Sequence, residues 1–245
     1  MSTSVPALRF DAVSACTARG LPVLRELDLE VPQRGLFGIV GPNGAGKSSL
    51  LRTVLGLLPL SAGRLSIAGR PQHEWRADEL ARHIGYVAQK VHSHWDLRVD
   101  EILQLASPRL APELRERLEL SPLLDRPFNV LSGGEQARVA IARALAHEPA
   151  LLLADEPAAH LDLPHQHELM QQLRELAATR AIVIVLHDFH LASRYCDTVA
   201  LVSGGTVRHC GAPAQVLSAA TLSAVYARSI EVHRHDSGAF FTLGT

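Results

Sequence analysis

The sequence predicts an α/β fold with a parallel-sheet core, preceded by an antiparallel β subdomain and interrupted by a helical subdomain. Segments 36–40, 151–154 and 181–186 are nearly continuous apolar runs, which suit parallel strands covered on both faces. Segment 27–31 instead alternates apolar and acidic residues, the pattern of a half-buried strand. Each apolar run ends in polar residues, and ligands collect beyond the carboxyl ends of parallel strands. We therefore expect a ligand site at that edge of the sheet.

The helical subdomain is expected at about residues 90–145, inserted in the α/β core. Segments 99–106 and 112–120 have helical patterns, and Ser-Pro pairs interrupt them. Segment 136–147 predicts a strong helix that ends before Pro149.

The C-terminal part, about residues 200–245, is expected to form a β/α extension. Gly204-Gly205 separates two strand-like segments and predicts a hairpin. With 245 residues the chain can bury a sizeable core. We expect residues 1–245 to form one domain with an inserted lobe.

Composition and charge exclude several classes of function. The 24 basic and 25 acidic residues nearly cancel, so no overall field attracts nucleic acid or anionic lipid. Aromatic residues make up only 4%, which argues against a base-stacking surface. We therefore expect no nucleic-acid partner.

Cysteine usage and hydropathy indicate a cytoplasmic protein. Cys16, Cys196 and Cys210 share no metal-ligand spacing and are expected to be reduced packing thiols. The N-terminus does not resemble a signal peptide, and the apolar runs are too short to span a bilayer. If the protein works at a membrane, another chain spans it.

Residues 41–48 match the phosphate-loop pattern G-x-x-x-x-G-K-S, between a predicted strand and a predicted helix. Glycines let backbone amides approach phosphates, Lys47 adds a charge, and the Ser48 hydroxyl is expected to coordinate Mg²⁺. A chance glycine-rich turn is the alternative, which the flanking strand and helix make improbable. The residues expected to bind nucleotide here are Gly41, Pro42, Asn43, Gly44, Ala45, Gly46, Lys47, Ser48 and Ser49.

Asp155 and Glu156 follow the second apolar run. Buried adjacent carboxylates are costly unless a positive charge offsets them, and Mg²⁺ is the natural partner. We expect Asp155 to bind the metal and Glu156 to polarise the attacking water. The alternative is a helix cap followed by a solvated acid.

His187 and Gln89 are further candidates. His187 follows the third apolar run and could bind the γ-phosphate or hold Glu156 and water in line, although single histidines are more often structural. Gln89 precedes the helical lobe and could ligate Mg²⁺ through its amide oxygen, a weak signal on its own.

The signature segment, residues 131–135, predicts a second phosphate site. Its capping box explains Ser132 and Glu135 but not Gly133 and Gly134, which cost helix stability. Glycines at a helix start let an anion approach the free amides. This site would contact the same nucleotide as the phosphate loop but from the opposite side. That arrangement requires two copies of the chain face to face.

Together these motifs resemble those of ABC transporter ATP-binding subunits, in that family's order and approximate spacing. The matching elements are residues 41–48, Gln89, 131–135, 151–157, Leu161-Asp162 and His187. The resemblance implies a P-loop NTPase (RecA-like) core and a homodimer that binds two ATP with Mg²⁺. Each ATP would contact one subunit's phosphate loop and the other's signature segment, with Asp162 nearby.

The resemblance also implies partners and a location. Gln89 would sense the nucleotide, and the adjoining lobe would dock on polytopic transmembrane permease subunits. A periplasmic or surface substrate-binding protein would take part indirectly. The chain would lie at the cytoplasmic face of the inner membrane.

The chain departs from the family pattern in three places. Segment 15–19 lacks the usual adenine-stacking aromatic residue, which Arg19 or Val23 would replace with weaker selectivity for ATP over GTP. Ala159-His160 replaces the usual serine-alanine pair, and Ala88 precedes Gln89 where proline is common.

The branch of the family is indicated by fewer residues. Segments 162–166, 187–192, 224–226 and 232–234 resemble importers of iron chelates, haem or cobalamin. Segment 94–97 instead resembles zinc and manganese importers. The 13 histidines form isolated pairs rather than a site with three or four ligands, so we interpret them as surface residues.

Two other classes remain as alternatives. A soluble ABC ATPase of DNA repair would need a long coiled coil, and one of translation would usually carry two cassettes. A phosphate-loop kinase lacks the signature glycines, and a GTPase would carry an Asn-Lys-x-Asp motif that is absent from the sequence.

Overall fold

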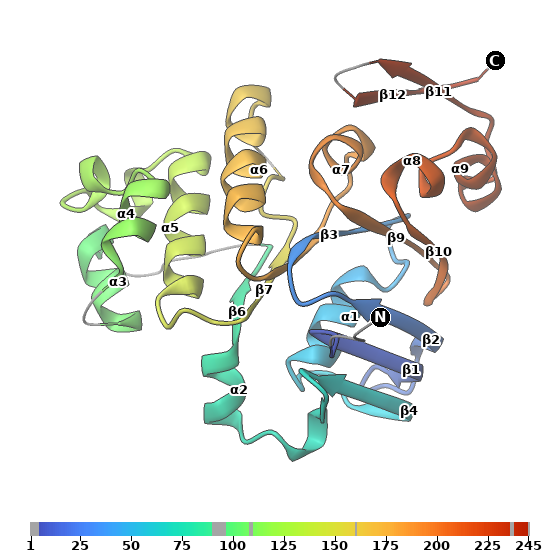
Figure 1. Cartoon of the computed structure of the whole chain (residues 1–245), viewed down its shortest axis with the longest axis horizontal. Helices are drawn as coiled ribbons and strands as arrows, with labels where there is room; N and C mark the ends of the chain where they lie inside the picture. The colour runs from blue at the N-terminus through green and yellow to red at the C-terminus, as the bar shows by residue number, and fades with distance from the viewer. Residues whose placement is uncertain (1–4, 90–96, 108–109, 160, 236–237, 245) are drawn as a thin grey trace.

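A computed structural model describes residues 5–89, 97–107, 110–159, 161–235 and 238–244 (Figure 1). The described strands form a six-stranded sheet in the order β10-β9-β3-β8-β7-β6. Its strands are β3 (Gly35–Val40), β6 (Ile84–Val87), β7 (Leu151–Asp155), β8 (Ala181–Val185), β9 (Thr198–Ser203) and β10 (Thr206–Gly211). All neighbouring pairs are parallel except β9 and β10, which form the expected hairpin. The predicted α/β class and parallel core are confirmed.

The three apolar runs form the adjacent strands β7, β8 and β3, as expected. Alternate residues of β3 enter two hydrophobic cores on opposite faces of the sheet: Leu36 and Val40 on one, Phe37 and Ile39 on the other. Burial on both faces explains why the run is continuously apolar.

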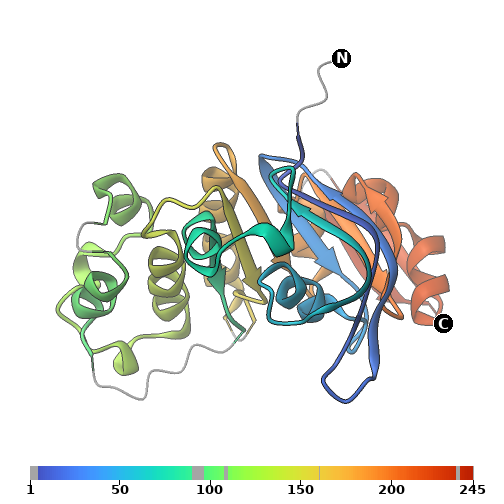
Figure 2. The same ribbon diagram turned by 90° about the horizontal axis from the view of Figure 1, so that it is seen from below.

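A separate antiparallel sheet has the order β2-β1-β4-β5. Its strands are β1 (Leu8–Cys16), β2 (Pro22–Val31), β4 (Leu60–Ile67) and β5 (Arg70–Pro71). The predicted alternation is confirmed, because Leu27, Leu29 and Val31 are buried while Asp28 and Glu30 are exposed. The sheet shares one core with β3 and with α1 (Lys47–Val54), the helix that it curves around in Figure 2.

The helices α3 (Val99–Ala106), α4 (Pro112–Arg117) and α5 (Gly133–Leu145) lie at the far end of the molecule from the antiparallel sheet (Figures 1 and 2). The prediction for α3 is confirmed. The prediction for α4 is too long, because Glu119 takes a left-handed φ of 49° that ends the helix. α5 begins three residues before the predicted start, at the signature segment.

Other helices cover the two faces of the central sheet. They are α2 (Ala77–His83), α6 (Leu163–Ala177), α7 (Phe189–Tyr195), α8 (Pro213–Val216) and α9 (Ala219–Tyr226), with short 3-10 turns at Gln72–Glu74, Ser121–Leu123 and Phe128–Val130. A hairpin of β11 (Ile230–His235) and β12 (Gly238–Leu243) packs on α7, where His190 stacks on Phe240 with ring centroids 5.1 Å apart. Among the described helices, none has the length and apolarity needed to cross a membrane.

The cysteines do not all pack inside the fold. Cys196 is buried, and burial raises its pKa to about 12. Cys16 is half-buried, whereas Cys210 on β10 is exposed. The expectation of a packing thiol is therefore wrong for Cys210, which lies on an edge strand that has no fully buried residue.

Candidate functional site

The phosphate loop connects β3 to α1 at the carboxyl edge of the sheet. Gly41 and Gly46 have φ values of 149° and 101°, which favour glycine. A Cβ on Gly41 would lie 1.9 Å from the Val202 carbonyl oxygen, so no side chain fits there. The loop closes around its own lysine, because Lys47 Nζ donates to the carbonyl oxygens of Gly41 (2.8 Å) and Pro42 (2.9 Å).

Lys47 is buried, with 5% of its surface exposed. Burial lowers the pKa of its ammonium, and the carboxylates of Glu156 and Asp155 oppose that shift. The lysine charge therefore faces the acids at the end of β7. An anion that enters the loop would meet both this charge and the free amides that begin α1.

Asp155 ends β7 and is 2% exposed. Ser48 Oγ donates to its Oδ1 at 3.0 Å. Burial raises the pKa of Asp155, while the bond from Ser48 lowers it and the charge of Glu156 raises it further. A hydroxyl and a carboxylate side by side are the oxygen ligands that Mg²⁺ prefers, so this pair fits the expected metal site.

Glu156 lies directly after β7 in a strained conformation. Its φ is 54°, in the left-handed region, and its side chain is buried. Gln89 Nε2 donates to Glu156 Oε2 at 2.7 Å, and His187 Nε2 lies 2.5 Å from Oε1. Residues that follow three neighbouring strands, β6, β7 and β8, thus converge on one carboxylate.

The loop and the acid face one pocket of about 260 Å³. Its lining residues are Val23, Asn43, Gly44, Ala45, Gly46, Lys47, Ser48, Ser49, Glu156 and His187. Val23 brings β2 to this pocket, whereas Arg19 is exposed and is not among the lining residues. Of the two candidates for contact with a base, the pocket therefore contains Val23.

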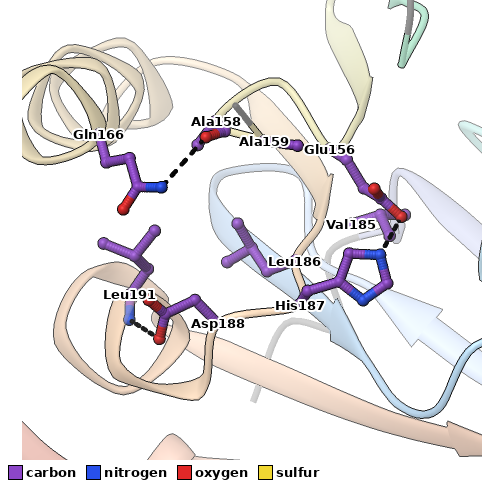
Figure 3. Close-up of a pocket in the computed structure, with 9 residues that line it drawn as sticks. All are labelled: Glu156, Ala158, Ala159, Gln166, Val185, Leu186, His187, Asp188 and Leu191. Carbon is purple, nitrogen blue, oxygen red and sulfur yellow. Dashed lines mark hydrogen bonds and ion pairs between the residues drawn. The ribbon is translucent and has the colours of Figure 1, made fainter. Parts of the chain in front are cut away.

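A smaller pocket of about 90 Å³ lies behind the Glu156–His187 pair (Figure 3). It is lined by Glu156, Ala158, Ala159, Gln166, Val185, Leu186, His187, Asp188 and Leu191. Gln166 Nε2 donates to the Ala158 carbonyl oxygen at 3.3 Å and holds the turn that follows the acid.

The signature segment begins α5 with the predicted capping box. Ser132 Oγ accepts from Glu135 N (3.3 Å), and Glu135 Oε2 accepts from Ser132 N (2.7 Å). Burial acts to raise the pKa of Glu135, but the bonds with Ser132 and the nearby Arg126 guanidinium hold it below its usual value. The Glu135 carboxylate is thus engaged within its own chain, which leaves the free amides of the first turn to meet an anion.

The segment 132–135 and Asp162 are not among the residues that line the phosphate-loop pocket. Asp162 caps α6 by accepting from His165 N at 3.3 Å. Within one chain, the two predicted phosphate sites are therefore separate. Some residues used in the sequence interpretation lie outside the described residues. They are His160, Trp95 and one of the isolated histidine pairs, His92 and His94.

Sequence reasoning missed two residues beside the site. His165 and Gln166 were noted only for their resemblance to one branch of the family. Asp162 could have drawn attention to them, because an N-cap aspartate fixes the first turn of the helix that carries both side chains.

Comparison with known proteins decides the family. Residues 24–159 match the model of the ABC transporter family. Hemin import ATP-binding protein HmuV of Streptomyces coelicolor is 40% identical over 229 residues, which cover 88% of this chain and 82% of that protein. The chain belongs to the ABC transporter family. It is an ATP-binding subunit and an ATPase, as the resemblance implied.

Further relatives agree with this assignment. Cobalamin import ATP-binding protein BtuD of Halobacterium salinarum is 34% identical over 227 residues, covering 87% of this chain and 57% of that protein. The structure of cbiO1 from Clostridium perfringens, part of the ABC transporter complex cbiONQ, superimposes with a TM-score of 0.79 at 28% identity, covering 89% of this chain and 92% of that one. A putative metal-chelate type ABC transporter in an inward-facing conformation shares the fold, with a TM-score of 0.80 at 22% identity, covering 98% and 97%.

Proposed function

We propose that this ABC ATPase powers an importer of a metal chelate, namely an iron-siderophore complex, haem or cobalamin. Relatives that are 40% and 34% identical are named for hemin and cobalamin import, which supports the cargo class. The chain would work at the cytoplasmic face of the inner membrane, bound to separate transmembrane permease subunits. A periplasmic or surface substrate-binding protein would deliver the chelate.

The convergence of Gln89 and His187 on Glu156, in the pocket that Lys47 also lines, is the observation that carries the proposed chemistry. Glu156 is the general base that polarises water, and His187 positions the acid and the water. Lys47 and the loop amides stabilise charge on the transferred phosphoryl group. Mg²⁺, when bound by Ser48 and Asp155, would neutralise phosphate charge. Gln89 donates an amide N–H to Glu156, which leaves its amide oxygen to serve as a third metal ligand.

Two copies of the chain would enclose two ATP molecules. The separation of the signature segment from the phosphate-loop pocket supports this arrangement, because one protomer does not bring both phosphate sites together. Ser132, Gly133 and Gly134 of one protomer would bind the ATP held by the other's loop, with Glu135 fixing the cap. Asp162 would lie at the same interface as the cap of α6.

Substitution of the general base tests the proposed chemistry. Glu156→Gln keeps the shape of the side chain but removes the base, so we expect kcat to fall at least about 100-fold. ATP affinity should stay unchanged, because Lys47 and the loop amides remain. Steady-state phosphate release and binding of a fluorescent ATP analogue measure the two effects.

Glu168→Gln is the matched control, since Glu168 is an exposed acid on α6, outside the residues that line the pocket. It should hydrolyse ATP at the normal rate. If Glu156→Gln kept more than a tenth of the activity, Glu156 would not be the base.

Co-purification tests the transport role. The tagged chain should co-purify with an untagged polytopic membrane protein from solubilised membranes. Recovery of the tagged chain without such a partner would contradict the transport role.

A further inference from the structure

The first turn of α6 lies between the signature glycines and the turn that follows Glu156. A Cβ placed on Gly134 would lie 3.3 Å from His165 Cδ2 and 3.4 Å from its Cβ and Cγ. The His165 ring therefore packs directly against the backbone that begins α5. The next residue, Gln166, donates to the Ala158 carbonyl oxygen.

The His165 ring is held in place by the cap of its own helix. Asp162 accepts the backbone N–H of His165 at 3.3 Å, and its Oδ1 also contacts the ring Nδ1. The ring is about half exposed, and the contact with Asp162 adds to the packing against Gly134 that sets its orientation. An oriented ring can set how closely the first turns of α5 and α6 approach each other.

The Gln166 amide contacts the turn that follows Glu156, the proposed general base. It donates to the carbonyl oxygen of Ala158, two residues after Glu156 (Figure 3). Ala159 N donates to the Glu156 carbonyl oxygen at 3.0 Å. These bonds stabilise the turn in which Glu156 takes its left-handed conformation. The N-terminal end of α6 therefore contacts both the signature segment and the turn that follows Glu156.

We propose that His165 and Gln166 are positioning residues that hold Gly133-Gly134 at a fixed spacing from Glu156. This inference rests on the proposed function, in which the glycines face the partner's ATP and Glu156 faces the protomer's own. The two contacts, called here the His165 arm (to Gly134) and the Gln166 arm (to Ala158), are made by adjacent residues of a 15-residue helix, which is rigid over this distance. Errors of about 1 Å in such placement can cost up to about 100-fold in rate.

Dimerisation driven by ATP tests the His165 arm. In the Glu156→Gln background, His165→Ala should weaken ATP-driven dimerisation about tenfold, because the first turn of α5 loses its packing partner. Binding of ATP to the monomer should not change, since His165 is not among the phosphate-loop pocket residues. Sedimentation velocity across a protein dilution series, with ATP and Mg²⁺, measures the dimer constant.

Two further variants separate positioning from a general loss of fold. His165→Phe keeps the ring against Gly134 and should restore dimerisation to within about twofold of the parent. His147→Ala removes an exposed histidine just beyond the other end of α5 and should match the parent. Failure of Phe to improve on Ala would overturn the packing argument.

Loss of the Gln166 arm should lower kcat instead of weakening dimerisation. Gln166→Glu has the same shape but cannot donate to Ala158, so kcat should fall about tenfold while KM for ATP stays within about twofold. A rise in KM with normal kcat would overturn the role of Gln166.

If the Glu156→Gln parent does not dimerise with ATP, the proposed sandwich fails and the inference fails with it. If the parent dimerises and His165→Ala dimerises equally well, only the inference fails.

Discussion

Glu156 combines an unfavourable backbone conformation with the central position in the site. Left-handed φ in a non-glycine residue costs of order 1 kcal/mol and persists only where the surroundings impose it. The surroundings here are the bonds from Gln89 and His187 to the carboxylate and from Ala159 N to the carbonyl oxygen. The strain aims the carboxylate into the pocket that also contains Lys47.

Nucleotide selectivity is a property of single residues beside the pocket. Val23 lines it, and none of the described lining residues is Phe, Tyr or Trp, so a base gains area burial without stacking on such a ring. We expect ATP and GTP to bind within about tenfold of each other, as judged by competition against a fluorescent nucleotide. Thr17 lies in segment 15–19, where the family usually has its adenine-stacking aromatic residue, and Thr17→Tyr should strengthen ATP binding by about 1 kcal/mol through stacking. A wild-type preference for ATP well above tenfold would contradict the prediction.

The residues of the candidate site could be predicted from the sequence, but their mutual contacts could not. Lys47, Asp155 and His187 could be predicted because each follows a continuous apolar strand, and parallel strands align their carboxyl ends. The bond from the Gln89 amide nitrogen to Glu156 depends on side-chain rotation, and the contact of His165 with Gly134 depends on how two helices pack. Neither geometry leaves a periodic signal in the sequence.

At the scale of elements, capping residues determine where α5 begins, whereas tertiary packing determines the pairing and exposure of the C-terminal strands. The predicted capping box at Ser132 is confirmed and starts α5 at Gly133, although glycine disfavours helix, whereas the helical pattern of segment 136–147 alone places the start too late. The hairpin β11–β12 was not predicted as a pair, because part of its burial comes from packing on α7, where Phe189 contacts Phe241. The edge position of β10 likewise leaves Cys210 exposed.

The end of α2 should make stability depend on pH. His83, its last residue, packs against Trp75 with ring centroids 4.7 Å apart, and burial lowers its pKa below 6.5. The unfolded chain therefore binds a proton at this residue more readily, so stability is lost as pH falls through 6.5 toward the folded pKa. Urea unfolding at pH 7.5 and pH 5.5 should show a smaller loss for His83→Gln than for the wild type. Equal losses would show that His83 is not responsible.

At the scale of the whole molecule, one protomer carries two half-sites. The phosphate loop and Glu156 share a pocket, while the free amides that follow Ser132 begin a helix outside it. Two copies could complete both sites by placing each signature segment over the other's loop. The sequence predicted this arrangement because the capping box left the paired glycines without a structural reason.

Complementation between two inactive variants tests that central claim most directly. Lys47→Ala removes the loop charge, and Gly133→Asp places a negative charge where the γ-phosphate would bind while suiting a helix N-terminus. Each variant alone should lack ATPase activity. A mixture should regain activity, because a mixed dimer pairs the intact loop of one protomer with the intact glycines of the other. If the mixture stays as inactive as the separate variants, the glycines do not act on the partner's ATP.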